Sequence, residues 1–215
     1  GISYADAVLA DGPLAYWRLG EDTTPTAVDA TGNGHDGLYV GGVTVSVPGA
    51  IAGDADTAVH FDGAAEVTVA DVFGFEGNAT FSVEAWIKPE TSECSFIGKV
   101  WKEVDTYHGW LIYLQGTEMT VRRGYNLTGP HPPLDEWTHV VATYDGYTLR
   151  LYQDGQLSND RQVSNALPTH SEPFTFGRTY QWVACQITMD EVAVYGTNLS
   201  PTRILAHYEI GAGLR

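Results

Sequence analysis

The chain has 215 residues, with 11 Lys and Arg against 27 Asp and Glu, which gives a formal net charge of −16. This balance excludes a nucleic-acid-binding surface, because such a surface must present cations to the phosphates. Hydrophobic residues make up 43% of the chain, enough for a sizeable core, so intrinsic disorder is excluded as well. Only 18% of the residues are charged, whereas Gly, Tyr and Trp are plentiful, and this composition predicts a turn-rich, all-β protein.

No stretch of the sequence approaches the roughly 20 apolar residues of a membrane-spanning helix. The sequence begins at Gly1 and lacks both an initiator Met and a basic-then-apolar leader. We therefore expect no membrane span and interpret the sequence as a processed or excised part of a longer protein.

Helical periodicity is confined to the two ends of the chain, over residues 4–10 and residues 200–210. For the second helix, Ser200 is a good N-cap, Pro201 fits the first helical position and Gly211 follows as a stop signal. We expect two short terminal helices.

Between these helices the hydrophobic pattern has period two. In residues 81–87, Phe81, Val83, Ala85 and Ile87 share one face, which predicts a strand with one face turned inward. The pair Asp145-Gly146 is a strong hairpin signal between two β-rich runs. Strands are also predicted over residues 14–19, 58–61, 66–69, 95–99, 110–115, 118–123, 138–144, 148–152, 174–176 and 187–195.

Many short strands follow one another without a Pro- or Ser-rich linker, a repeat or a run of charge. This organisation predicts a single domain over residues 1–215, built as an antiparallel β-sandwich. The two cysteines, Cys94 and Cys185, fit no zinc or redox spacing, and the sequence leaves open whether they form one disulfide or stay as two buried thiols.

Five blocks of the sequence occur in an order that carries a family resemblance. They are Tyr-Trp-Arg-Leu-Gly-Glu at 16–21, Asp-Ala-Thr-Gly-Asn-Gly-His-Asp-Gly at 29–37, and residues 81–89, 137–146 and 189–195. Together they resemble the laminin G-like members of the concanavalin A-like lectin/glucanase superfamily. The resemblance implies a jelly-roll sandwich, and it is less specific for function, since that superfamily contains lectins, carbohydrate-binding modules, adhesion domains, glycanases and lyases.

The resemblance also implies a structural Ca²⁺ between the Gly-rich loop at 29–37 and the aspartate of the last strand. Carboxylate and carbonyl oxygens are the ligands that Ca²⁺ prefers. The implied ligands are Asp29, Asn33, the backbone carbonyl of His35, and Asp190. In the alternative interpretation, Asp29 caps a turn and Asp190 accepts hydrogen bonds from backbone amides.

Aromatic and basic residues gather in three segments, at 99–110, 122–125 and 178–182. Aromatic rings offer flat surfaces for sugars, and Arg can pair with carboxylates, so glycans, acidic ones included, are the expected ligands. The candidate binding residues are Trp101, Tyr107, Trp110, Arg123, Tyr125, Arg178, Tyr180 and Trp182. For Trp110 and Arg178, which lie close to scaffold-like blocks, a packing role is the competing interpretation.

The sequence does not favour catalysis. Glycanases of this superfamily place paired carboxylates in a Glu-x-Asp-x-x-Glu pattern, which is absent here. Regular alternation along the last strand would set Asp190 beside Val192 and Val194, and Glu191 on the opposite face, so the two carboxylates could not flank one bond.

We therefore expect a non-catalytic, calcium-stabilised carbohydrate-binding module, secreted or displayed at a cell surface as one part of a larger protein. Two alternatives remain open. One is a polysaccharide lyase or glycoside hydrolase, with His108, Arg123, Tyr125 and Tyr180 as lyase candidates. The other is an adhesion domain whose partner is a protein.

Overall fold

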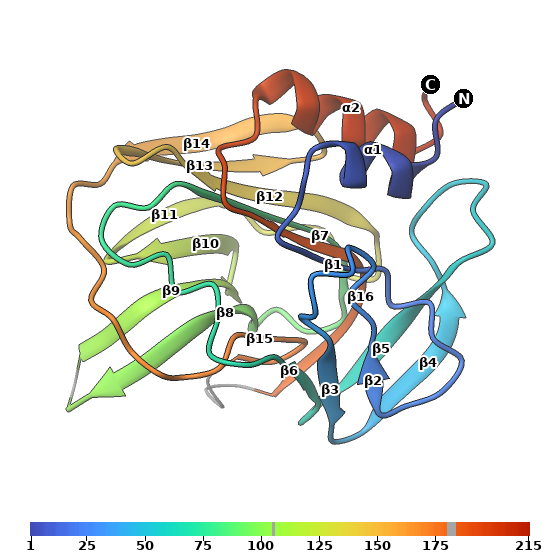
Figure 1. Ribbon diagram of the computed structural model, residues 1–215, viewed down its shortest axis with the longest axis horizontal. Coiled ribbons are helices and arrows are strands. Elements are labelled where there is room, and N and C mark those ends of the chain that lie inside the picture. Colours follow the sequence, from blue (N-terminus) through green and yellow to red (C-terminus); the bar gives the residue numbers. More distant parts are fainter. Residues whose placement is uncertain (105, 180–183) are drawn as a thin grey trace.

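The computed structural model describes residues 1–104, 106–179 and 184–215. It shows two antiparallel sheets stacked face to face, with two short helices (Figure 1), which confirms the predicted jelly-roll sandwich. Sheet A contains β14 (Gln156–Gln162), β13 (Thr148–Gln153), β12 (Thr138–Tyr144), β7 (Phe81–Pro89), β16 (Cys185–Tyr195), β5 (Thr57–Gly63) and β4 (Val43–Pro48) in that order, with β1 (Ala15–Trp17) paired to β16.

Sheet B is the second layer. Its order is β11 (Tyr125–Pro130), β10 (Glu118–Arg123), β9 (Thr106–Gln115), β8 (Cys94–Glu103), β15 (Thr175–Phe176), β6 (Glu66–Thr68), β3 (Gly37–Val40) and β2 (Thr26–Ala27). The aromatic and basic segment at 99–110, which lies between the strands predicted over 95–99 and 110–115, belongs mainly to the β8–β9 hairpin, so both strands extend further than predicted. This pairing fixes which of their side chains face the core.

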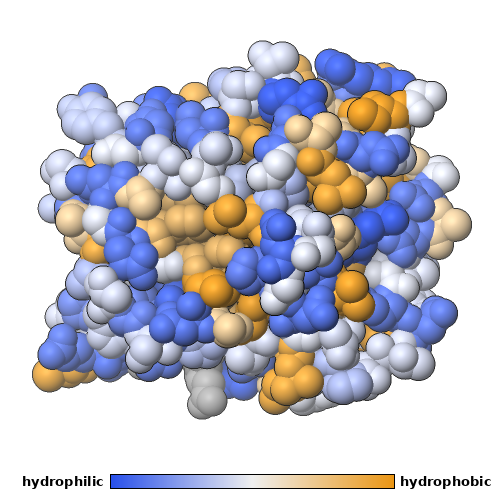
Figure 2. Space-filling view, viewed as in Figure 1, coloured by the Kyte–Doolittle hydropathy of each residue, from blue (hydrophilic) through white to orange (hydrophobic). Residues whose placement is uncertain are grey.

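The hydrophobic core lies between the two sheets and is rich in aromatic rings. The predicted inward set of β7, Phe81, Val83, Ala85 and Ile87, is buried there as expected. Trp17 stacks on Phe174 at 5.7 Å between ring centroids. Figure 2 shows that hydrophobic side chains gather near the centre of one side of the molecule, while hydrophilic side chains dominate its periphery.

The outer side of sheet A is covered by both helices, α1 (Tyr4–Ala10) and α2 (Pro201–Gly211), which lie together with the two chain ends (Figure 1). The predicted caps are present, since the Ser200 side chain accepts a hydrogen bond from the amide of Arg203. Tyr4, Trp86 and Ile204 form a second apolar cluster under the helices. As a result β7 is buried on both faces, not on one.

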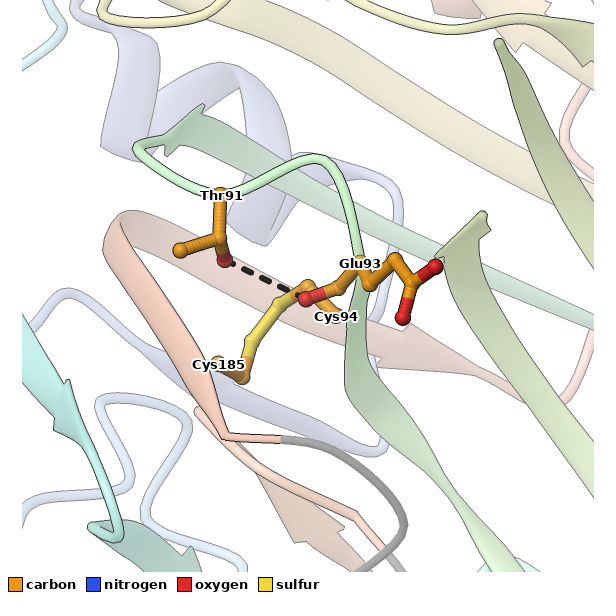
Figure 3. Close-up of a disulfide and its surroundings, with 4 residues drawn as sticks. All are labelled: Thr91, Glu93, Cys94 and Cys185. Carbon is orange, nitrogen blue, oxygen red and sulfur yellow. Dashed lines mark hydrogen bonds between the residues drawn. A yellow bond between two sulfur atoms is a disulfide. The ribbon is translucent and has the colours of Figure 1, made fainter. Parts of the chain in front are cut away.

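A disulfide joins the two layers. Cys94 on β8 of sheet B is bonded to Cys185 on β16 of sheet A (Figure 3), which resolves the alternative that the sequence left open. Beside it, the Thr91 hydroxyl donates a 3.2 Å hydrogen bond to the carbonyl of Glu93. Among the helices of the described residues, none has the length and apolar character needed to cross a membrane.

Candidate functional site

The outer surface of β8, β9, β10 and β11 forms what we call the sheet B face. Among the described residues, both helices lie against sheet A, so no helix covers this face. Beyond a register shift between Ser95 and Ile97, β8 and β9 alternate: Lys99 and Trp110 pair with their side chains turned inward, and Leu111 lies opposite Gly98 on the outer side. Val100, Leu111 and Tyr113 form a small apolar cluster that is separate from the core, with Tyr107 packed against it.

Polar side chains complete the sheet B face. Arg122 lies opposite Leu111 on one side and Asn126 on the other, and Thr120 lies opposite Tyr113. The Asn126 amide donates a 3.2 Å hydrogen bond to the Tyr113 hydroxyl. Tyr113 and Thr120 are buried, so the groups that reach solvent on this face are the Tyr107 ring, the Arg122 guanidinium and the Asn126 amide.

Two cations are held beside the Tyr107 ring. The Lys102 ammonium lies 5.4 Å from the ring centroid, and the Arg122 guanidinium carbon lies 5.7 Å from it. Arg122 also donates a 3.4 Å hydrogen bond to the Tyr107 carbonyl. These cation–π contacts position the two charges without neutralising them.

Three predicted binding residues reach the surface of sheet B or its edge. Tyr107 is part of the face, and Tyr125, at the start of β11, is 49% exposed. The Arg161 guanidinium carbon lies 4.9 Å from the Tyr125 ring centroid. Arg178, which follows β15, is partly buried and donates a 3.5 Å hydrogen bond to the Ala64 carbonyl.

For Trp110 and Arg123 the predicted binding role is wrong, because the pairing of β9 with β10 points both side chains toward the interior of the sandwich. Trp110 is fully buried, and its indole N–H donates a 2.8 Å hydrogen bond to the Phe73 carbonyl. Arg123 is also fully buried, donates to the carbonyls of Asn165 at 2.9 Å and Gly77 at 2.6 Å, and burial lowers the pKa of its guanidinium. Both residues anchor loops to the core, so the packing interpretation of Trp110 is confirmed.

Trp101 is not a free platform for a ligand. Its indole stacks with His108 at 4.5 Å and with His170 at 3.9 Å between ring centroids. These imidazole rings occupy stacking positions that a ligand ring would need. Tyr180 and Trp182 lie outside the described residues.

The loop at 29–37 is organised by its first carboxylate. Asp29 accepts hydrogen bonds from the amide of Tyr16 at 3.1 Å, from the amide and hydroxyl of Thr31 at 3.0 and 2.7 Å, and from the amide of His35 at 3.1 Å. Burial alone would raise the pKa of Asp29, but the hydrogen bonds from Thr31, Tyr16 and His35 lower it.

The other two loop candidates have partners of their own. The Asn33 amide donates to the Leu14 carbonyl at 3.0 Å, and the His35 carbonyl accepts the Trp17 indole N–H at 2.9 Å. The contacts of this loop match the turn-capping alternative that the sequence left open.

A β-bulge changes the position of Asp190. The pairing of β16 with β7 shifts register between Asp190 and Ala193, and Glu191 has a φ of 53°. The predicted grouping of Asp190 with Val192 is therefore wrong, because the extra residue resets the alternation. Asp190 lies opposite Trp86 on the outer side of sheet A, whereas Val192 is in the core.

Asp190 belongs to a group of acidic side chains. One of its oxygens accepts a 2.8 Å hydrogen bond from the amide of Ala50, and the other is buried with no partner among the described residues. Burial and the charge of Glu191 raise the pKa of Asp190, and burial raises the pKa of Glu191 to about 7. The bulge thus brings both carboxylates to the same side of the sheet.

Arg18 balances part of this negative charge. Its guanidinium lies 3.1 Å from Glu191, 3.0 Å from Asp54 and 2.8 Å from Asp56. A cavity of about 250 Å³, lined in part by Arg18, Gly20 and Asp56, opens beside these residues. Within residues 1–104, 106–179 and 184–215, no set of three or more His, Cys, Asp or Glu side chains forms a recognisable metal-binding group.

The jelly roll with one helix-covered sheet and one polar, helix-free face defines a lectin-like sandwich domain. The chain belongs to the concanavalin A-like lectin/glucanases superfamily, whose laminin G-type family model matches residues 61–205. This confirms the family indicated by the sequence blocks. No curated protein matches the chain significantly.

Solved structures share the fold at low sequence identity. Domain 4 of AbnA, a GH43 extracellular arabinanase from Geobacillus stearothermophilus in complex with arabinotriose, has a TM-score of 0.69 and 20% identity, covering 91% of this chain and 98% of that one. The binding domain of Paraclostridial Mosquitocidal Protein 1 has a TM-score of 0.71 and 14% identity, covering 94% and 52%. The binding domain of Botulinum Neurotoxin DC in complex with SialylT has a TM-score of 0.68 and 13% identity, covering 93% and 51%. The chain thus spans about half of each toxin binding domain.

The sequence analysis missed the residues at the centre of the sheet B face. Tyr113, Asn126 and Arg122 were not selected as binding candidates. Alternation within 118–123 carried the signal, because it separates Thr120 and Arg122 from Val121 and Arg123.

Proposed function

We propose that this chain is a non-catalytic, lectin-like module that binds a polysaccharide or glycan on the sheet B face. The observation that carries the proposal is the helix-free face itself, where the partly exposed Tyr107 and Arg122 and the exposed Asn126 lie over the buried side chains of Val100, Leu111 and Tyr113. Such a surface suits a sugar, which offers apolar C–H patches and many hydroxyl groups. The arabinotriose and SialylT complexes of structural neighbours support a carbohydrate as the ligand.

The position of the acidic pair supports a non-catalytic role. Asp190 and Glu191 lie on the outer side of sheet A, and the sheet B face belongs to the other layer. A glycanase needs its two carboxylates on either side of the bond to be cleaved, at the place where the sugar binds. The secreted or cell-surface location that we propose fits the disulfide, because disulfides persist in oxidising compartments.

A glycan array tests this function. We expect the chain to bind at least one glycan and to release it unchanged, and both Tyr107→Ala and Asn126→Ala to weaken that binding by about tenfold or more, the equivalent of about 1.4 kcal/mol. Tyr147→Ala is the matched control, because Tyr147 is 56% exposed in the turn between β12 and β13 of sheet A. New reducing or unsaturated ends would instead indicate an enzyme, and binding of no glycan would favour a protein partner.

We also propose a structural Ca²⁺ at Asp190. The support for this proposal is the buried, unpartnered oxygen of Asp190, an oxygen donor of the kind that Ca²⁺ prefers, in a region where burial and the charges of Glu191 and Asp56 raise its pKa. The bound ion would supply positive charge that offsets the repulsion among these carboxylates. Asp29 fits less well, because its oxygens already accept four hydrogen bonds, and we assign it the ordering of its own loop.

Calcium binding predicts a stability effect. Saturating Ca²⁺ at about 100 times its dissociation constant adds about 2.7 kcal/mol, which corresponds to a rise in Tm of roughly 5–10 °C for a chain of this size. We expect Asp190→Asn to abolish this rise in thermal melts with Ca²⁺ and with chelator. Asp29→Asn should lower the Tm yet keep the response to Ca²⁺. An equal Tm with and without Ca²⁺ in the unsubstituted chain would contradict the metal site.

A further inference from the structure

We infer that the ligand of the sheet B face is an acidic polysaccharide, whose carboxylate or sulfate groups pair with Arg122 and Lys102. This inference rests on the proposed carbohydrate-binding function and names the class of its ligand. It depends on how this chain distributes its few cations.

Within the described residues, five of the eleven cations of this acidic protein form ion pairs with carboxylates. Ion pairs join Arg150 to Asp145 at 2.6 Å and Arg203 to Asp11 at 2.8 Å. Arg18 has three acidic partners, and Lys99 and Arg215 are paired with Asp71 and Glu209. With 27 acidic residues against 11 basic ones, such pairing is what the composition leads one to expect.

Arg122 and Lys102 belong to the cations without such a pair, and they lie together beside the Tyr107 ring on sheet B. Across the part of the chain that the structure describes, neither has a carboxylate within ion-pair distance, and their described contacts are with Tyr107. Arg122 is partly buried between Leu111 and Asn126, so its position is set by the sheet. The side chains are thus positioned in advance, while no carboxylate of the described residues pairs with their charges.

A third cation lies at the edge of the same face. Arg161, on β14, donates a 3.0 Å hydrogen bond to the Asn126 carbonyl and lies over the Tyr125 ring. Within the described residues no ion pair neutralises it either, so Lys102 on β8, Arg122 on β10 and Arg161 on β14 are three such cations, with Arg161 at the edge of the sandwich beside β11. Spaced cations of this kind match a polymer that carries repeated negative charges.

The charge of the whole molecule makes this local arrangement informative. A net charge of −16 repels an anionic polymer, so such a ligand needs a confined basic region to bind at all. A neutral glycan accepts hydrogen bonds from these cations but has no negative charge to pair with them. Arg and Lys next to aromatic surface instead supply charge-assisted hydrogen bonds to carboxylate or sulfate oxygens.

Titration calorimetry of the full chain with three polysaccharides tests the inference: polygalacturonate, heparin and neutral arabinan, each at low and high NaCl. We expect polygalacturonate or heparin to bind more tightly than arabinan, and their affinity to fall at least tenfold at high salt. A preference for polygalacturonate would identify carboxylate as the recognised group, and a preference for heparin would identify sulfate. Arg122→Gln and Lys102→Gln should each reduce the affinity by about tenfold, with Arg122→Lys retaining part of it.

The matched control is Lys88→Gln. Lys88 is also a cation over an aromatic ring, 5.2 Å from the centroid of Trp137, and it has no ion pair in the described part of the chain, but it lies on β7 of sheet A. An equal loss in Lys88→Gln, or salt-independent binding, would overturn the assignment. Binding of arabinan alone, weakened by Asn126→Ala, would overturn the acidic ligand and leave the proposed function intact, whereas binding of no polysaccharide would overturn both.

Discussion

Replacing Cys94 and Cys185 together with alanine is expected to lower the free energy of unfolding by roughly 4–5 kcal/mol. The disulfide closes a loop with a sequence separation of 91 residues and joins sheet B to sheet A. In the chain-entropy account, a loop of that size restricts the unfolded chain by about this amount. Alanine is chosen over serine because both positions are almost fully buried and a hydroxyl there would need a partner.

Urea unfolding of the unsubstituted and double-alanine chains, followed by tryptophan fluorescence, measures this loss. Reduction of the unsubstituted chain should lower its stability by a similar amount, whereas the double-alanine chain should not respond to reductant. A difference below about 1 kcal/mol would mean that the cross-link contributes little to holding the layers together.

Glu84→Gln is expected to cost about 3–5 kcal/mol, because it breaks a buried ionic network. The Glu84 carboxylate on β7 lies 3.2 Å from the His139 ring on β12 and 3.1 Å from the His207 ring on α2. It also accepts a hydrogen bond from the Tyr195 hydroxyl on β16. The other ring nitrogen of His207 lies 3.0 Å from the Asp11 carboxylate at the end of α1, so one carboxylate holds both helices on the sheet.

The pH dependence of stability follows from the same contacts. Burial alone would raise the pKa of Glu84, but His207 and His139 lower it well below its usual range; burial would lower the pKa of His207, but Glu84 and Asp11 raise it. Because the folded-state pKa of Glu84 is lowered, its contribution to stability is fully present above pH 4.5 and is lost as the pH falls through the folded pKa. Because the folded-state pKa of His207 is raised, its contribution is fully present below pH 6.5 and is lost as the pH rises through the folded pKa. The contribution of the network is therefore largest between these two values.

Chemical unfolding of the unsubstituted chain and of Glu84→Gln across the pH range measures this contribution as the difference between their free energies of unfolding. Glu103→Gln is the control, since Glu103 is exposed and its only described ion pair is a 3.8 Å contact with His108. Its effect should stay within about 0.5 kcal/mol. A Glu84→Gln cost that does not change with pH would show that His207 is not charged in this network.

The parts of the fold that the sequence predicted are those with strong local signals. Ser200 and Pro201 mark the start of α2, and the period-two pattern of residues 81–87 identifies the inward face of β7. The strands that it missed include β4 and β14, which lie at the two edges of sheet A and have mainly exposed or partly exposed residues. Edge strands of this kind lack the hydrophobic contrast on which the prediction depends.

The candidate site was harder to predict, because adjacent residues on a strand point to opposite faces. Arg123 was chosen where Arg122 faces outward, and Trp110 was chosen at the start of a predicted strand whose pairing turns it inward. Similarly, regular alternation could not foresee the bulge at Glu191, which depends on long-range pairing of β16 with β7. In each case a shift of one residue along the strand decides whether a side chain faces the core or the outside.

In this account the two sheets have different roles, stability for sheet A and ligand contact for sheet B. Sheet A carries the helices, the buried Glu84 network and the acidic group around Asp190, all of which serve stability in this account. Sheet B keeps its outer surface free of helices and presents aromatic, polar and basic side chains. The proposed glycan contact thus lies on sheet B, whereas the two chain ends lie on the outer side of sheet A.

The most direct test of this assignment is a ¹H–¹⁵N NMR titration of the full chain with a short acidic oligosaccharide such as trigalacturonate. The account predicts that the largest shift changes fall on the amides of Leu111, Arg122 and Asn126 across the sheet B face, while those of α1, α2 and β13 stay still. Shifts centred on the helices or on the Asp190 group, with the sheet B amides unmoved, would contradict it.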